Sequence, residues 1–261
     1  EHTVLNGVDF QVPEGELTVI LGPNACGKST TLKALARVNP LKEGEVRLDG
    51  TPLPQMKSRA IAKILAMLPQ TPEAPSGVTV ADVVARGRYP HQSLLRSWSD
   101  EDERACVEAM QAANVLELAE RPIEALSGGQ RQRVWIAMTL AQQTPLILLD
   151  EPTTYLDITH QIEVLNLTKK LHSEGRTVAV VLHDLNLAFR YATHVVLMKQ
   201  GRIIAQGDPR AIITPELIQE VFDLQSVIIP DPCTGTPLVI PKENQTIHIA
   251  ADAISAARES E

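Results

Sequence analysis

The stretch Gly22–Thr30 reads Gly22-Pro23-Asn24-Ala25-Cys26-Gly27-Lys28-Ser29-Thr30. It follows the apolar run Leu17–Leu21 and opens Thr31–Val38, a segment without strong helix breakers. Strand, glycine loop and helix start are the context in which the pattern G-x-x-x-x-G-K-[ST] indicates nucleotide binding. The glycines let backbone N–H groups point at phosphate oxygens, and a helix beginning near Lys28 adds its positive end. The stretch predicts a phosphate-binding loop; the plain alternative is a glycine turn between a strand and a helix.

Four side chains complete the predicted chemistry of this loop. Lys28 can reach the β- and γ-phosphates, and the Ser29 hydroxyl is placed to ligate Mg²⁺. The apolar run Leu146–Leu149 ends in Asp150 and Glu151. A carboxylate at the end of a buried strand beside a phosphate loop is where P-loop enzymes hold Mg²⁺. We predict that Asp150 holds the metal through water and that Glu151 is the general base; the alternative is two solvated acids.

A second glycine loop, at residues 126–130, also opens a helix. It reads Leu-Ser-Gly-Gly-Gln, and its predicted site residues are Ser127, Gly128, Gly129 and Gln130. The simple interpretation is that Ser127 caps the helix. The functional interpretation is a second anion site, which one nucleotide cannot share with the first loop of the same chain. We therefore expect it to serve a nucleotide held by another copy.

The composition limits the class of protein. The 261 residues carry a net charge of −8 with 3% aromatic residues, which argues against a nucleic-acid module. Three distant cysteines, Cys26, Cys106 and Cys233, predict neither a disulfide framework nor a zinc site. No apolar stretch approaches the roughly 20 residues that span a bilayer, and no secretory signal is evident, so we expect a cytoplasmic location. We also expect natural sequence to precede Glu1.

The pattern of apolar runs predicts an α/β fold. Val8–Val12 and residues 46–48 suggest a small antiparallel sheet, and the apolar runs at 146–149 and 178–182, with a helix between them, suggest parallel strands. A further apolar run lies at 64–68. Residues 158–173 predict a helix, 195–198 and 203–205 a hairpin, 214–216 a helix start, and the prolines from Pro230 onward irregular structure. Ser99 or Asp100 is expected to cap a helix with an apolar face formed by Cys106, Ala109, Met110 and Ala113. The tail from Ala250 is either a small helix or frayed.

We therefore predict a single domain over residues 1–261, a P-loop NTPase core with a mostly parallel sheet and an N-terminal antiparallel β subdomain. Residues 1–70 and 145–229 form this core, 71–144 an inserted helical subdomain, and 230–261 a C-terminal extension.

These motifs together resemble the nucleotide-binding subunit of ATP-binding cassette (ABC) transporters, from about Val4 to Pro241. The resemblance is carried, in order, by Gly22–Thr30, Gln70, Leu126–Gln130, residues 148–152, Leu156-Asp157 and His183. It implies that Thr30 lies on the α-phosphate side and that Gln70 senses the γ-phosphate, the metal or the attacking water. It also implies that Asp157 couples two sites across a homodimer, while His183 holds the γ-phosphate or polarises the water. Ser127, Gly128 and Gly129 would close on ATP bound by the opposite subunit.

Further stretches resemble the iron-chelate (ferric siderophore) import branch, with vitamin B12, haem and zinc importers as near relatives. They are residues 86–91, 153–157 and 231–237. The resemblance implies a Mg²⁺-dependent ATPase that is peripheral on the cytoplasmic face of the inner membrane. Its partners would be ATP, a second copy, membrane permease subunits and, indirectly, a solute-binding protein, with no nucleic acid. A soluble ABC ATPase that moves no solute is the alternative. Residues 86–91 are either a permease contact or a solvated loop.

Two positions depart from the family pattern or invite a separate hypothesis. Many relatives have glycine where Ala25 stands, and alanine is costly there only if φ is positive. Cys26 lies beside a helix start, which tends to lower a thiol pKa, so its alkylation is expected to block nucleotide; a small buried side chain is the alternative. The aromatic that stacks on adenine in the family is expected upstream of Glu1, and we assign no such residue.

Overall fold

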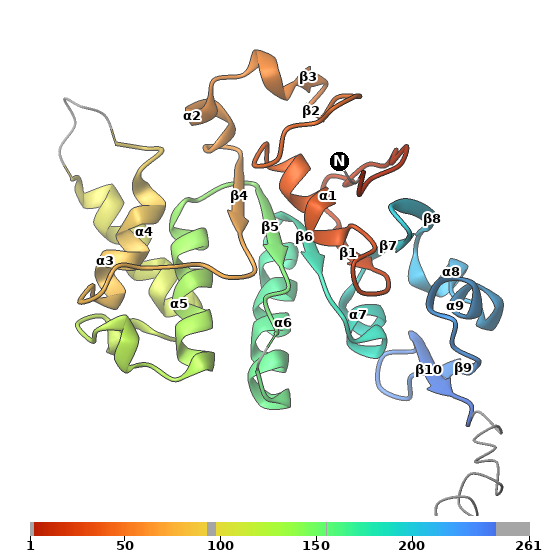
Figure 1. The fold of residues 1–261 in the computed structure, drawn as a ribbon. Helices are drawn as coiled ribbons and strands as arrows, with labels where there is room; N and C mark the ends of the chain where they lie inside the picture. The colour runs from red at the N-terminus through yellow and green to blue at the C-terminus, as the bar shows by residue number, and fades with distance from the viewer. Residues whose placement is uncertain (1–2, 93–97, 155, 244–261) are drawn as a thin grey trace, which may run out of the picture.

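The computed structural model describes residues 3–92, 98–154 and 156–243. Its centre is a six-stranded sheet with the order β4-β5-β6-β1-β7-β8, in which only β8 is antiparallel to its neighbour (Figure 1). The strands are β1 Leu17–Leu21, β4 Leu65–Leu68, β5 Leu146–Asp150, β6 Thr177–Val181, β7 His194–Lys199 and β8 Arg202–Gly207. The predicted mostly parallel sheet is confirmed, and so is the hairpin predicted from residues 195–198 and 203–205, which is β7–β8.

Burial of both faces explains the uninterrupted apolar runs. Every residue of β1 and β6 is buried. Alternate residues enter two apolar clusters, so that Leu149 packs with the cluster of α6 and Leu148 with that of α1. The helices on these faces are α1 Lys28–Leu35, α6 Ile158–Ser173 and α7 Leu185–Tyr191. The α6 bounds agree with the prediction.

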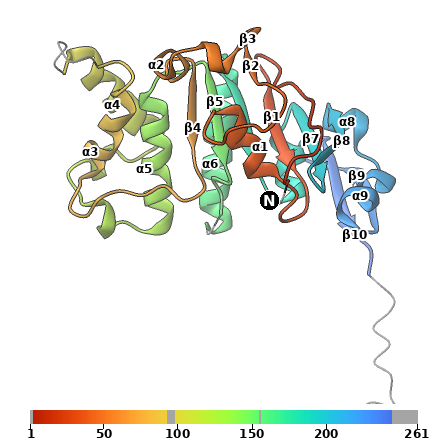
Figure 2. The ribbon, with the colours of Figure 1, turned by 45° about the horizontal axis from the view of Figure 1, so that its top comes forward.

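A group of helices covers the β4 end of the sheet (Figures 1 and 2). It contains α3 Val80–Ala85, α4 Asp100–Ala112 and α5 Gly128–Ala141, and α2 Ser58–Ile61 lies near its edge. Ser99 caps α4 in a capping box with Asp102, as expected from the sequence. Single 3₁₀ turns lie at Leu53–Gln55, Arg86–Arg88, Leu116–Leu118 and Ile123–Ala125. Of the helices in the described ranges, none is long and apolar enough to cross a membrane.

The N-terminal strand prediction is wrong. Residues 8–12 have no strand assignment, and antiparallel pairing is confined here to β2 Arg47–Leu48 with β3 Thr51–Pro52. Val8, Phe10 and Val12 do face the α1-side cluster, so their alternation reports burial. Alternating burial of side chains does not by itself place a second strand alongside for the backbone to pair with.

The C-terminal part is more regular than its prolines suggest. After α8 Pro209–Ile212 and α9 Pro215–Phe222, β9 Ser226–Pro230 pairs antiparallel with β10 Pro237–Pro241. The expected irregular structure is therefore wrong. The three strand prolines lie at the ends of this short ladder, where a missing N–H is tolerated. The expectation about the tail from Ala250 lies outside the described residues.

Candidate functional site

The phosphate loop joins the carboxyl end of β1 to α1, as predicted. Gly22 has no room for a side chain, because a Cβ there would lie 2.2 Å from the Met198 carbonyl oxygen. Gly27 has φ +106°, a conformation that L side chains rarely adopt. Asn24 and Ala25 are exposed at the tip, Pro23 is partly buried, and Thr30 lies in the first turn of α1.

Lys28 places a buried positive charge inside this loop. Its side chain is 5% exposed, and Nζ donates hydrogen bonds to the carbonyl oxygens of Gly22 at 2.8 Å and Pro23 at 3.0 Å. Burial of an ammonium group is costly unless its donors are satisfied. The loop thus holds the ammonium with its own carbonyl groups, close to where phosphate oxygens would meet the helix start.

Ser29 and Asp150 form the part of the site that fits a divalent cation. Ser29 Oγ donates to Asp150 Oδ1 at 2.7 Å, while Asp150 Oδ2 is buried without a hydrogen-bond partner among the described residues. Burial raises the pKa of Asp150, against the Ser29 hydrogen bond that lowers it. A hydroxyl and a carboxylate are hard oxygen ligands of the kind that Mg²⁺ takes together with phosphates and water. The orphaned oxygen is therefore consistent with the predicted metal role.

Two predicted catalytic side chains, Gln70 and His183, meet at the carboxylate of the third, Glu151. Glu151 Oε2 accepts a hydrogen bond from Gln70 Nε2 at 2.6 Å, and Oε1 lies 2.8 Å from His183 Nε2. Thr154 Oγ1 also donates to Oε2, at 3.2 Å. Gln70, Glu151 and His183 follow β4, β5 and β6, which are adjacent in the sheet. Parallel order brings these strand ends to one edge, beside the loop that follows β1, where open α/β sheets bind ligands.

Glu151 is oriented by an unusual backbone conformation. Its φ is +51°, which a non-glycine residue seldom adopts. The side chain is only 10% exposed, whereas that of His183 is 45% exposed. A carboxylate that is largely buried, beside a histidine that is half exposed, can accept a proton from a water molecule and pass it to solvent through the histidine.

The second glycine loop caps α5. Ser127 Oγ accepts from the Gln130 N–H at 3.2 Å, and Gln130 Oε1 accepts from the Ser127 N–H at 3.1 Å. Ser127 and Gly128 are exposed, so capping leaves this helix start open to solvent. In Figures 1 and 2, β4 and β5 lie between α5 and α1. The structure thus confirms the cap and does not bring this loop onto the phosphate loop of the same chain.

Asp157 caps α6 and is tied to the second glycine loop by His160. Its carboxylate accepts from the His160 N–H at 2.9 Å and lies 2.7 Å from His160 Nδ1. The pKa of Asp157 is lowered, first by the backbone hydrogen bond and then by that of the ring. The same ring lies against Gly129, where a Cβ would come within 3.0 Å of His160 Cδ2. The absence of a side chain at Gly129 thus leaves room for the His160 ring, which brings the start of α6 into contact with the second glycine loop.

Gly129→Ala is expected to displace the His160 ring and weaken its hydrogen bond to Asp157. The pKa of Asp157 should rise toward its ordinary value, because a hydrogen bond to the charged form is weakened. NMR titration of the Asp157 carboxyl and the His160 ring signals measures both effects. Gly128→Ala is the control, since a Cβ there meets nothing within 4 Å and should leave both signals in place. Equal signals in the two variants would contradict the contact.

Ala25 has φ +60°, in the left-handed region, so alanine is conformationally strained at this position, where many relatives have glycine. Ala25→Gly is expected to raise the free energy of unfolding by about 1 kcal/mol, because it removes left-handed strain. Denaturant unfolding measures this. Ala36, at φ −83°, is the control, and Ala36→Gly should be destabilising. A lower stability for Ala25→Gly would contradict the assignment of strain.

The reactive-thiol hypothesis for Cys26 is wrong. The side chain is 4% exposed, and burial raises the pKa of the thiol, although Lys28 beside it acts in the opposite direction. Desolvation of a thiolate outweighs the helix start here. Cys26 is a small buried side chain of the α1-side cluster.

Residues 86–91 are largely structural. Arg88 is 1% exposed and pairs with Asp102 at 2.9 Å. The ring of His91 lies 2.9 Å from the Gln142 carbonyl oxygen. Only Tyr89, 64% exposed, projects as a contact residue would.

Thr154 and His160 contact the candidate site although the sequence motifs do not single them out. Thr154 lies in the branch-specific stretch 153–157. His160 lies in the predicted helix 158–173, three residues after Asp157, which is a spacing typical of a helix cap. Thr154 is only three residues from Glu151, whereas the contact of His160 with Gly129 joins segments far apart in the sequence and has no local signal. Tyr155, which belongs to one of the branch-specific stretches, lies outside the described residues.

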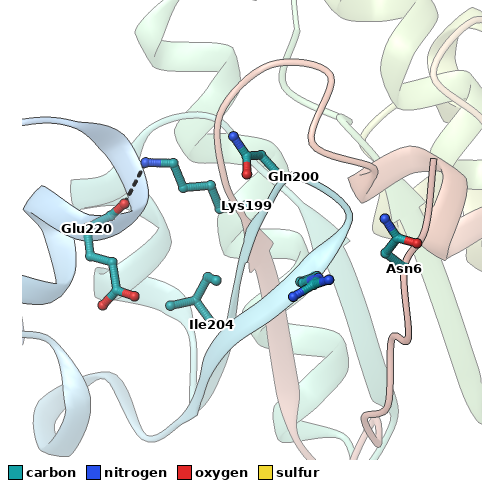
Figure 3. Close-up of a pocket in the computed structure, with 6 residues that line it drawn as sticks. Asn6, Lys199, Gln200, Ile204 and Glu220 are labelled. Carbon is teal, nitrogen blue, oxygen red and sulfur yellow. Dashed lines mark hydrogen bonds between the residues drawn. The ribbon is translucent and has the colours of Figure 1, made fainter. Parts of the chain in front are cut away.

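A cavity of about 510 Å³ lies at the β7–β8 turn and contains none of the predicted site residues (Figure 3). It is lined by Asn6, Lys199, Gln200, Arg202, Ile204 and Glu220. Lys199 Nζ is held by the Glu220 carbonyl oxygen at 2.7 Å and by Asp223 at 3.0 Å. Gly201, in the turn, donates its N–H to the Cys26 carbonyl oxygen at 3.0 Å. The β7–β8 turn therefore supports the phosphate loop through this backbone hydrogen bond.

Comparison with known proteins agrees with this geometry. A family profile described as "ABC transporter" matches residues 5–154. The Ferric enterobactin transport ATP-binding protein FepC of Escherichia coli (strain K12) is 49% identical over 92% of this chain and 89% of its own. The Achromobactin transport ATP-binding protein CbrD of Dickeya dadantii (strain 3937) is 51% identical over 92% and 90%.

Solved structures share the fold. An inward-facing ABC transporter assigned to the metal-chelate type matches with a TM-score of 0.78 and 28% identity, over 93% of this chain and 94% of its own. The dimeric bacterial ABC transporter cassette MJ0796 matches with a TM-score of 0.71 and 30% identity, over 80% and 92%.

Proposed function

This chain belongs to the ABC transporter family of ATP-binding proteins, and from that premise we propose that it hydrolyses ATP to power uptake of a ferric siderophore or a similar iron chelate. The observation that carries the ATPase part is the Glu151 carboxylate at the end of β5. Gln70 contacts it from the end of β4 and His183 from the end of β6, the strands on either side of β5. Glu151 stands directly after Asp150, whose partner Ser29 belongs to the phosphate loop. A base, a metal-binding pair and a phosphate loop at one sheet edge are what hydrolysis of a nucleoside triphosphate needs.

The roles in one site follow from the contacts. Lys28 would exchange its loop carbonyls for β- and γ-phosphate oxygens, and Thr30 would lie on the α-phosphate side. Ser29 and Asp150 would hold Mg²⁺, Asp150 through water, with Gln70 as a further contact. The bound metal would supply neutralisation of developing phosphate charge. Backbone N–H groups of residues 22 and 24–27 would bind the phosphates; Pro23 has none to donate.

Glu151 would activate the attacking water. Its carboxylate is already oriented by two donors, Gln70 and Thr154, and by the contact with His183. A carboxylate offers about four lone-pair positions, so one remains for a water molecule beside these three contacts. Gln70 follows β4, next to the α3–α5 helices, and would report the state of the site to them. We propose that residues 71–144 form the helical subdomain that contains these helices, that residues 1–70 and 145–229 form the core, and that residues 230–261 form a C-terminal extension.

A second copy would complete the site. Ser127 and Gly128 are exposed at the start of α5, away from α1 of the same chain (Figures 1 and 2). An exposed capped helix start is suited to bind an anion, and the similar cassette MJ0796 is a dimer by its printed description. We propose a head-to-tail homodimer in which Ser127–Gln130 closes on the partner's ATP. Asp157, joined to Gly129 through His160, would couple the two sites.

The transport part is supported by the relatives. Proteins described as transporting ferric enterobactin and achromobactin are each about half identical to this chain over most of its length. We propose a ferric siderophore as the solute class, a peripheral position on the cytoplasmic face of the membrane, permease subunits as direct partners and a solute-binding protein as an indirect one. Exposed Tyr89 is the proposed permease contact within residues 86–91.

Uptake measurements test the solute class. A strain lacking this chain should lose uptake of at least one labelled ferric siderophore and keep uptake of haem and cobalamin. Wild-type chain should restore the loss and Glu151→Gln should not. Loss of haem, cobalamin or zinc uptake instead would favour one of those importers. Unchanged uptake of every solute, with the chain absent from the membrane fraction, would favour the soluble ABC ATPase.

A further inference from the structure

The C-terminal hairpin β9–β10 is joined to the first turn of α7 by the side-chain amide of Asn186. Asn186 Nδ2 donates to the Val239 carbonyl oxygen at 3.2 Å, and Asn186 Oδ1 accepts from the Val239 N–H at 2.8 Å. Val239 is 3% exposed in β10. One side chain therefore satisfies both backbone groups of a buried strand residue, which fixes the strand and the helix relative to each other.

An ion pair one turn further along α7 makes a second link. Arg190 donates from Nε at 3.1 Å and from Nη2 at 2.6 Å to Asp231 Oδ2. Asp231 is 4% exposed, and the Arg190 hydrogen bond lowers its pKa. Its other oxygen accepts from the Cys233 and Thr234 N–H groups. The turn of the hairpin and the end of α7 are thus held by the same carboxylate.

Both links act on the helix that begins directly after His183. Asp184 caps α7 by accepting the Leu187 N–H at 2.8 Å, and Asn186 is three residues from His183. Apolar contact reinforces this arrangement, since Phe189 of α7 and Val239 of β10 belong to one buried cluster. The hydrogen bonds of Asn186 and Arg190 therefore tie the helix that follows His183 to the hairpin.

We propose that the β9–β10 hairpin is a clamp that positions His183, and that Asn186 and Arg190 are positioning residues for the hydrolytic step. This rests on the proposed function, in which His183 acts at the γ-phosphate or on the water. The hairpin lies outside the six-stranded sheet. Its contribution is to hold a half-exposed histidine at hydrogen-bond distance from a nearly buried carboxylate, an arrangement in which small displacements are costly for catalysis.

A double-mutant cycle between Asn186 and His183 tests the clamp. Asn186→Ala is expected to lower the kcat for ATP by roughly 10- to 100-fold with KM nearly unchanged. In a His183→Ala background the same change should have no further effect, because a residue acting through His183 has nothing left to position. Tyr191→Phe is the matched control. It removes a hydrogen bond from the same helix to Asn166, at 2.8 Å, and should leave kcat unchanged.

The NMR ring signals of His183, identified by their loss in His183→Ala, give a readout independent of turnover. They should shift in Asn186→Ala and stay in place in Tyr191→Phe. If Asn186→Ala does not fold, Arg190→Lys is the second variant, because lysine keeps the charge and loses the forked donors. Independent, additive losses of kcat or unmoved His183 signals would overturn the clamp. Wild-type turnover of His183→Ala would instead overturn the role of His183, while shifted ring signals would still support the clamp.

Discussion

Glu151→Gln is expected to lower ATP turnover by about 10²- to 10⁴-fold while ATP binding stays intact. Glutamine has nearly the shape of glutamate but cannot accept a proton. The carboxylate is the acceptor for Gln70 and the contact of His183, so its replacement removes the group on which both converge. Lys28, Ser29 and the loop backbone are untouched, and these groups are the proposed source of nucleotide affinity.

Two assays separate the outcomes for this variant. Fluorescent-nucleotide binding measures affinity, and phosphate release measures turnover. Glu174→Gln is the matched control, since Glu174 is an exposed carboxylate 3.9 Å from Lys170 on the last turn of α6. It should keep wild-type values in both assays. Turnover near wild type in Glu151→Gln would remove Glu151 from the role of base and leave the loop chemistry standing.

Ser127→Arg is expected to permit ATP binding to one chain and to abolish the closed, ATP-induced dimer. Ser127 is exposed at the start of α5, where a long cationic side chain would fill the space proposed for the partner's γ-phosphate. The substitution also removes an N-cap, at a cost of about 1 kcal/mol to the fold. That local cost must be separated from the effect on dimerisation.

Ser99→Arg provides the matched control. Ser99 caps α4 in the same kind of capping box, with Asp102. It should therefore suffer a comparable local loss and still dimerise. Light scattering with and without ATP, in the Glu151→Gln background that prevents turnover, measures the dimer. Undiminished dimerisation of Ser127→Arg would contradict the proposed second half of the site.

Elements set by short-range patterns were predicted well. The β1–loop–α1 unit begins with an apolar run, α4 has the cap residue Ser99, and α6 is followed by Gly175, a residue type favoured just past a helix end. The failures have a common cause. The stretch at residues 8–12 alternates as a strand does but has no ladder partner, and Pro237 and Pro241 end a strand that Ser226–Pro230 pairs with. Pairing depends on what lies opposite, which a local pattern does not report.

The sequence by itself determined that this chain has a phosphate loop, a strand-end acid pair and a second capped glycine loop, because each depends on residues that are neighbours along the chain. Only the tertiary structure decided that Gln70 and His183 share the Glu151 carboxylate, because parallel strand order brings distant segments to one edge. It also decided that Ala25 is in the left-handed region and that the Cys26 thiol is desolvated. Burial and backbone angles are set by surrounding elements, and these come from everywhere in the chain.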